Sequence, residues 1–179
     1  MLYFISDTHF NHNKPFIYEP RGFSSVEEAD AAIIKNWNET VGKNDDIYVV
    51  GDFFLGTNMK YIEEVLNTLN GKIHLIIGNH DTDAKLKEYK KYSNIVEIAF
   101  GIRLKYKGKT YYVSHYPTLV GNFDDTEIPN VINLFGHTHS KEKFFEGRPS
   151  MYNVACDAHN CTPVSIEEIR ADIRNKIFN

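Results

Sequence analysis

Five short apolar runs along this chain each end in a residue type that binds metal ions. Short runs rich in β-branched and aromatic side chains are typical of strands that are buried on both faces. The carboxyl ends of parallel strands lie along one edge of a sheet, where α/β proteins bind their ligands. The repeated pattern therefore predicts one polar site at one edge of an α/β sheet. The polar stretches that follow the runs are Ser6-Asp7-Thr8-His9, Gly51-Asp52, Gly78-Asn79-His80-Asp81, Ser114-His115 and Gly136-His137-Thr138-His139.

The first half of the chain alternates strands with helices. Ser25 and Glu28 have the spacing of an N-terminal capping box, and apolar residues follow them at helical intervals. Alternating strands and helices predict parallel strands joined by right-handed crossovers. The predicted strands cover residues 2–5, 46–50 and 72–77, and the predicted helices begin after Ser25 and cover residues 59–70.

The second half is richer in strands and is expected to be more antiparallel. A polar helix is predicted over residues 83–92, and Ser165 with Glu168 forms a second capping box before the last helix. Residues 10–23 contain three turn formers without clear periodicity, which predicts a long irregular loop. The strands predicted in this half cover residues 95–100, 102–106, 110–113, 131–135, 143–145 and 151–155.

Composition limits the classes of function. The 179 residues suit a single domain over residues 1–179. A net charge of -4 argues against stable binding to duplex nucleic acid, which needs a basic surface. The two cysteines are too few for a disulfide framework, and no signal peptide or membrane span is visible. These features predict a cytoplasmic protein that does not bind membranes.

Seven side chains at the strand ends could bind metal ions. They offer imidazole nitrogens, carboxylate oxygens and an amide oxygen but no sulfur, a set that suits manganese, iron, cobalt, nickel or zinc. Seven donors exceed what one ion with an open coordination position takes, so we expect two divalent ions that share a carboxylate. His74 lies in the middle of a strand without polar neighbours and is interpreted as a histidine with no ligand role. The seven are Asp7, His9, Asp52, Asn79, His115, His137 and His139.

The ordered motifs from Asp7 to His139 resemble the signature of the calcineurin-like metallophosphoesterases, in particular the small bacterial and phage-type phosphodiesterases. The resemblance implies a four-layer α/β sandwich of two mixed β-sheets flanked by helices. It also implies a dinuclear centre, most often of Mn²⁺, in which Asp52 bridges the two ions. By matching position, one ion is held by Asp7, His9, Asp52 and His139, and the other by Asp52, Asn79, His115 and His137.

The same resemblance implies a mechanism. Hydroxide generated at the metals attacks phosphorus, and the imidazole of His80 protonates the leaving-group oxygen. Asp81 either orients that imidazole or caps the helix that follows it. A basic loop supplies Arg21, His12 and Lys14, which either contact the substrate phosphate or are only solvated.

The substrate is expected to be a small phosphodiester. In protein Ser/Thr phosphatases the second motif continues into an acid and a phosphate-binding arginine, whereas Phe53-Phe54-Leu55-Gly56 follows Asp52 here. That departure disfavours a phosphoprotein, and the preference for a diester comes from the resemblance alone. A phosphomonoesterase and a catalytically silent scaffold of the same fold stay as alternatives.

Aromatic residues near the motifs suggest a nucleotide. Such side chains stack on nucleobases, although core packing is the commoner use of aromatic rings in a chain that is 13% aromatic. Asp157, His159 and Asn160 form a polar loop that either supports the site or is a surface turn. The aromatic candidates are Phe10, Tyr18, Phe53, Phe54 and Tyr116.

Overall fold

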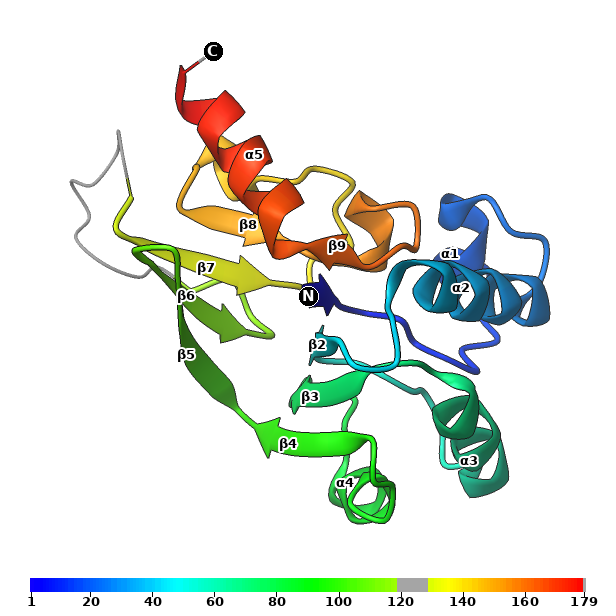
Figure 1. Cartoon of the computed structure of the whole chain (residues 1–179). Helices are drawn as coiled ribbons and strands as arrows, with labels where there is room; N and C mark the ends of the chain where they lie inside the picture. The colour runs from blue at the N-terminus through cyan, green and yellow to red at the C-terminus, as the bar shows by residue number, and fades with distance from the viewer. Residues whose placement is uncertain (119–128, 179) are drawn as a thin grey trace.

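The computed structural model describes residues 1–118 and 129–178, and these form two mixed sheets with flanking helices (Figure 1). The predicted fold class is thus confirmed. The first sheet has the order β4-β3-β2-β1-β9, and the second has the order β5-β6-β7-β8. The strands are β1 (Leu2–Ile5), β2 (Asp46–Val50), β3 (Lys72–Ile76), β4 (Ile95–Ala99), β5 (Gly101–Tyr106), β6 (Lys109–Ser114), β7 (Val131–Phe135), β8 (Met151–Asn153) and β9 (Val164–Ser165).

Strand directions follow the prediction in the first half and are mixed in the second. Strands β1 to β4 are parallel, and only β9 runs antiparallel in that sheet. In the second sheet β5 and β6 are antiparallel, as their short turn requires, but β6, β7 and β8 are parallel. The antiparallel pairs thus all involve strands of the second half, as expected, but the parallel pairing of β6, β7 and β8 was not predicted, because strand length and composition do not encode direction.

Most of the helices cover the outer face of the first sheet, and the last helix packs against the core between the two sheets (Figure 1). Residues 10–23, predicted to be irregular, contain two short helices. The predicted strand over 143–145 is reduced to one bridge between Phe144 and Tyr152. The helices are α1 (Pro15–Tyr18), α2 (Val26–Thr40), α3 (Met59–Thr68), α4 (Asp83–Tyr89) and α5 (Ile166–Phe178), with 3-10 turns η1 (Glu19–Arg21), η2 (Phe145–Gly147) and η3 (Cys156–Ala158).

Both predicted capping boxes are present. The Ser25 hydroxyl accepts a hydrogen bond from the Glu28 N–H, while the Glu28 carboxylate accepts from Ser24 rather than from Ser25. At the last helix the bonds are reciprocal between Ser165 and Glu168. These bonds satisfy N–H groups that the first turn of a helix leaves free, and they set where α2 and α5 begin.

Alternate residues of the first sheet enter two different cores. Ile47, Val49 and Leu75 point toward the helices α2, α3 and α4, where Trp37 is fully buried. Their neighbours Tyr48 and Val50 enter the core between the sheets, to which α5 also contributes. A strand that is buried on both faces needs apolar residues at every position, which explains the continuous apolar runs of the sequence.

The two sheets meet at the carboxyl ends of their strands. Ser6, just after β1, makes a parallel bridge to Ala155, which follows β8. The loop after β1 is also tied to the loop after β2, because the Asp7 and His9 N–H groups donate to Gly51 and Asp52 carbonyls at 3.1 and 3.0 Å. This junction gathers the polar motifs. No helix in residues 1–118 and 129–178 has the length and apolar character needed to cross a bilayer.

Candidate metal centre

The predicted ligands gather into two groups of donor atoms at this junction. Asp7, His9 and His139 form one group, in which the donor atoms lie within 4.8 Å of one another. A second group of the same compactness contains Asp52, His115 and His137. Each group combines one carboxylate with two imidazoles, a donor set that suits a divalent transition-metal ion. The groups match the division into two sites that the motif order implies.

Asp52 belongs to the second group and also faces the first. Its Oδ2 atom is 3.6 Å from His9 Nε2 in one group and 3.5 Å from His115 Nε2 in the other. Its other oxygen, Oδ1, accepts a hydrogen bond from the His80 N–H at 2.8 Å. The backbone therefore holds one oxygen and turns the other toward both groups, which is the placement that a bridging carboxylate needs.

Asp7 has one satisfied oxygen and one that is left without a partner. Oδ2 accepts from the Ser6 hydroxyl at 2.6 Å and from the His137 N–H at 2.8 Å. Oδ1 is buried without a hydrogen-bond partner among the described residues, and it lies 3.8 Å from both His9 Nε2 and His139 Nε2. A buried carboxylate oxygen without a partner is unfavourable, and a bound cation would satisfy it.

Hydrogen bonds at the far ring nitrogens orient two of the imidazoles. His115 Nδ1 lies 2.9 Å from the Val50 carbonyl, and His139 Nδ1 lies 3.1 Å from Asp157 Oδ2. With the proton at Nδ1, each Nε2 presents a lone pair to the centre of the site. The His9 and His139 Nε2 atoms then face each other at 3.2 Å, an arrangement that a shared cation would stabilise. Asn79 completes the second group, with Oδ1 3.0 Å from His115 Nε2.

The backbone at the site is strained. Left-handed φ angles are uncommon for residues with side chains, and such strain is concentrated at functional sites. The bends that these angles produce turn consecutive side chains of a loop toward one point. Five of the predicted ligands adopt these angles: Asp7 (54°), His9 (49°), Asp52 (53°), His137 (67°) and His139 (49°).

Two motif glycines make room for the carboxylates. A side chain at Gly136 would collide with the Ser6 hydroxyl and with Asp7 Oδ2, and one at Gly78 would collide with Asp52. Because these clashes would displace the two carboxylates of the site, each glycine is required for close approach of the backbone.

Burial and neighbouring charges shift the pKa values of the donors. Burial raises the pKa of Asp7 and lowers the pKa of His9 to about 2. Burial also acts to raise the pKa of Asp52, but the neighbouring His115 imidazole and the hydrogen bond from the His80 N–H outweigh it and lower that pKa to about 2. At neutral pH Asp52 is thus anionic and His9 is neutral, and these are the forms in which both bind metals.

Comparison with known proteins identifies the family. The family model of the calcineurin-like phosphoesterase superfamily domain matches residues 1–154. The chain belongs to the calcineurin-like phosphoesterase superfamily. Membership implies divalent metal ions, and the two donor groups described above fit them.

Relatives extend over nearly the whole chain. An uncharacterized protein of Methanocaldococcus jannaschii is 34% identical over 175 residues, which cover 94% of this chain and 88% of that protein. The gene 66 protein of Mycobacterium phage D29 is 27% identical, with 94% of each chain covered. The crystal structure of an Aquifex aeolicus protein of unknown function has a TM-score of 0.69 and 28% identity, covering 96% of this chain and 98% of that one.

His80, the predicted proton donor, lies beside the donor groups with a partly exposed side chain. Its side chain is 45% exposed, and its Nε2 lies 4.0 Å from Asp52 Oδ2. Its ring is also 5.4 Å from the ring of His9. The imidazole therefore stands at the open side of the site, while its backbone is held by Asp52.

Asp81 has neither of the two roles predicted for it. Its carboxylate accepts hydrogen bonds from the N–H groups of Gly78 and Asp52, both at 2.9 Å, and of Phe53 at 3.3 Å. Thr82, not Asp81, precedes α4 as the N-cap residue. Asp81 ties the loop after β3 to the loop after β2, so it positions Asp52.

Arg21 also differs from its predicted role. Its side chain is only 3% exposed, and its guanidinium donates to Asp157 and to the backbone carbonyl of Asp7 at 2.7 Å. A buried guanidinium with these partners has no free face for a substrate phosphate. Arg21 instead supports Asp157, which in turn holds His139. Although burial raises the pKa of Asp157, bonds from His139 and Arg21 lower it to about 2.

The other two basic-loop candidates are placed differently. His12 is 8% exposed, and its ring lies 5.3 Å from the ring of His9. Lys14 is exposed at the start of α1. Their substrate contacts remain predictions. Of the aromatic candidates, Phe10, Phe53 and Phe54 are fully buried in the core, whereas Tyr116 is 50% exposed, with its ring centroid 4.7 Å from that of His137.

The interpretation of His74 rested on a wrong premise. Two carboxylates flank it, with Glu97 Oε2 2.8 Å from Nδ1 and Asp46 Oδ1 3.0 Å from Nε2. These partners come from the adjacent strands β4 and β2, so they could not be seen along the strand of His74 itself. The histidine lies apart from both donor groups, in agreement with its having no ligand role.

Two supporting residues had no visible signal in the sequence. The Lys85 side chain is buried, and this burial lowers its pKa. Its ammonium group donates to the carbonyls of Phe54 at 2.5 Å and His80 at 2.7 Å. Asp30 on α2 accepts from the Asn11 N–H at 2.8 Å and so holds the loop that carries His9. Both act on backbone atoms, which any residue type provides, and this explains why spacing and motif did not identify them.

Proposed function

We propose that this chain is a dinuclear-metal-dependent phosphodiesterase that acts on a small phosphoester. The observation that carries the proposal is Asp52 Oδ2, which lies within 3.6 Å of one donor group and within 3.5 Å of the other. Two divalent ions, for which Mn²⁺ is our first choice, would supply water with a lowered pKa and neutralise charge on the phosphoryl oxygens. The seven donors named above would hold them.

His80 is proposed to donate the proton to the leaving group. The departing oxygen of a diester becomes a strong base, so a positioned acid lowers the barrier. The His80 side chain is exposed at the site, and its backbone is held on both sides, by Asp52 Oδ1 at the N–H and by Lys85 at the carbonyl. This two-sided anchoring supports the assignment, because general acid catalysis depends on position as much as on pKa.

The proposed substrate is small and could carry a nucleoside. Tyr116 supports this choice, since its half-exposed ring stands edge-on to His137 at the rim of the donor groups. An aromatic face at that place could stack on a base. The preference for a diester over a monoester continues to rest on the likeness to small phosphodiesterases.

Hydrolysis of bis(p-nitrophenyl) phosphate with and without added Mn²⁺ tests the proposal. We expect metal-dependent turnover that exceeds turnover of p-nitrophenyl phosphate. Because p-nitrophenolate is a weak base, the role of His80 is tested with a diester whose leaving group is an alkoxide, such as a dinucleotide, and there His80→Ala should slow turnover by about 10²-fold or more. Faster turnover of the monoester would replace the proposal with a phosphomonoesterase. No metal-dependent turnover of either diester would favour the silent scaffold.

A further inference from the structure

A cavity lies at the end of the second sheet opposite to the metal centre. Its volume is about 300 Å³, and it is bounded by α5, by the turn between β5 and β6, and by the start of β7. Lys109 begins β6, whereas the candidate ligand His115 follows the other end of that strand. The cavity is therefore separated from the candidate ligands by the length of a strand.

Basic side chains surround this cavity from two elements. Lys107 lies in the turn between β5 and β6, Lys109 begins β6, and Arg170 and Arg174 lie one turn apart on α5. Among the described residues of the lining, Glu167 is the one carboxylate, and Lys107 and Arg170 share it at 2.6 and 3.6 Å. Within these residues four cations accompany one carboxylate, which produces a local positive potential that would attract an anion.

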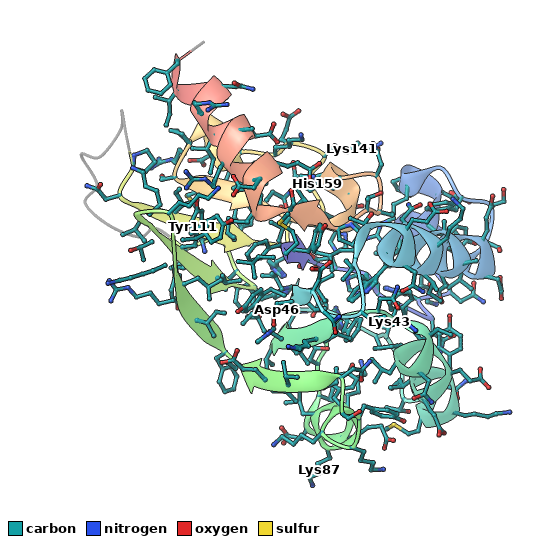
Figure 2. The ribbon with its side chains drawn as sticks, viewed as in Figure 1. Lys43, Asp46, Lys87, Tyr111, Lys141 and His159 are labelled. Atoms are coloured by element: carbon teal, nitrogen blue, oxygen red, sulfur yellow. The ribbon has the colours of Figure 1, made fainter. Side chains whose placement is uncertain are left out.

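A buried hydroxyl in the lining has no acceptor for its proton. Tyr111 is 1% exposed, and within residues 1–118 and 129–178 its only polar neighbour is the Arg170 guanidinium, which can donate to the hydroxyl oxygen but cannot accept its proton. Figure 2 shows this residue on the second sheet, on the side that α5 covers. A buried hydroxyl without an acceptor is rare, and a ligand that accepts its proton would satisfy it.

The rest of the lining is apolar. Ile132 and Ile173 are almost fully buried, and Phe178 is 70% exposed at the rim. An inorganic anion would leave these walls without a partner. A ligand that fits the whole cavity needs an apolar or aromatic body as well as a charged head group.

We propose that this cavity binds an organic phosphate or phosphonate with an apolar or aromatic body. Arg170 and Arg174 receive the head group, since guanidinium groups match tetrahedral oxyanions with paired donors. The Tyr111 hydroxyl donates to the same head group, and the isoleucines enclose the body. The inference does not depend on the proposed catalytic function, because no residue of the metal centre takes part.

Phenylphosphonate is the probe for this site, because its C–P bond resists phosphoester hydrolysis. In the full chain with ¹³C-labelled isoleucine methyl groups, titration is expected to shift the signals of Ile132 and Ile173 saturably. The signals of Ile47, in the other core, should stay in place. Shifts that do not saturate, or their absence at Ile132 and Ile173, would overturn the proposal.

Charge variants separate a built site from general attraction. R170Q/R174Q is expected to raise the Kd of phenylphosphonate at least about tenfold. The matched control K43Q/K87Q removes the same charge from exposed positions on the helical side of the first sheet, where Figure 2 labels both lysines, and should change the Kd less than about twofold. Equal weakening in both variants contradicts a defined site.

Two further measurements test the tyrosine and the head group. Tyr111→Phe keeps the ring and removes the hydroxyl, so we expect the Kd to rise about threefold to tenfold. Benzyl alcohol, which has the body without the charge, should bind at least about tenfold more weakly than phenylphosphonate. Equal affinity for the two compounds would show a merely apolar cavity and would refute the anion site. Asp52→Asn should leave the isoleucine shifts in place, and their loss would assign the binding to the metal centre instead.

Discussion

The metal centre and the cavity beside α5 carry polar groups of different kinds. At the metal centre the donors are short and several are buried, with side-chain exposures of 0% for Asp7, 2% for Asp52 and 1% for His115. At the cavity the charged groups are long and more open, with exposures of 57% for Lys107 and 29% for Arg170. Buried groups with fixed partners hold a precise geometry, whereas long exposed cations supply charge that adapts to its ligand. We therefore expect substitutions at the metal centre to have much the larger effects.

Asp52→Asn should produce the largest effect of all. The substitution keeps the acceptor for the His80 N–H but removes the negative charge that faces both donor groups. We expect the metal content and the turnover of bis(p-nitrophenyl) phosphate to fall, the latter on the order of 10³-fold. Metal analysis by mass spectrometry and steady-state kinetics measure the two quantities. Normal metal content in this variant would argue against a bridging role.

Two adjacent residues of one loop should separate metal binding from proton transfer. His80→Ala is expected to slow diester hydrolysis by about 10²-fold to 10⁴-fold with unchanged metal content, because the imidazole acts on the leaving group. Asn79→Ala should instead weaken one metal ion, since it removes an oxygen donor 3.0 Å from His115 Nε2. Titration with Mn²⁺ under turnover distinguishes them. The comparison fails if His80→Ala loses metal as readily as Asn79→Ala does.

Asp157→Asn tests how far the precision of the metal centre depends on its supports. The carboxylate holds His139 Nδ1 at 3.1 Å and pairs with the buried Arg21. Loss of its charge should weaken metal binding by about 10-fold to 100-fold through misorientation of His139. Asp172→Asn is the matched control, because that carboxylate binds Lys143 and Tyr152 away from the donors. Equal metal affinities in the two variants would show that metal binding does not depend on the contact between Asp157 and His139.

The last prediction concerns Asp30 and stability, and it depends on pH. Burial raises the pKa of Asp30 to about 6, from the usual 3.8 of an aspartate. Between these values the folded state holds the proton that the unfolded state has released, so this group lowers stability as pH rises from about 4 to about 6. Asp30→Asn should remove that loss, up to about 3 kcal/mol. Urea unfolding at pH 4 and at pH 7 measures it.

The control for this pH effect lies on the same helix. Glu39→Gln changes an exposed carboxylate whose side chain is 62% exposed. It should leave the difference in stability between pH 4 and pH 7 as it is in the unchanged protein. If Asp30→Asn does not flatten that difference relative to Glu39→Gln, the Asp30 carboxyl is not the group that titrates.

Local patterns sufficed for most of the strands, for the longer helices and for the side chains that gather in the two donor groups. Each motif is contiguous, as in Gly136-His137-Thr138-His139, and its strand precedes it directly, so the order along the chain carries both the residue types and their place at the sheet edge. The capping boxes at Ser25 and Ser165 were visible for the same reason, because their partners are three residues apart. Strand directions in the second sheet were not visible, since parallel pairing of β6 with β7 depends on a long connection.

Sequence by itself determined which side chains could bind metal, and tertiary structure decided what each oxygen and nitrogen faces. His139 contacts Asp157, and the buried Arg21 pairs with the same carboxylate. Asp81 accepts a hydrogen bond from the backbone of another loop. The residues in these contacts are between 18 and 136 positions apart in the chain. Such contacts form only when loops that are distant in the sequence come together in the fold, and many of the supporting partners are backbone groups that every residue shares. For this reason the donors could be identified from motifs, whereas their supports could be identified only from the fold.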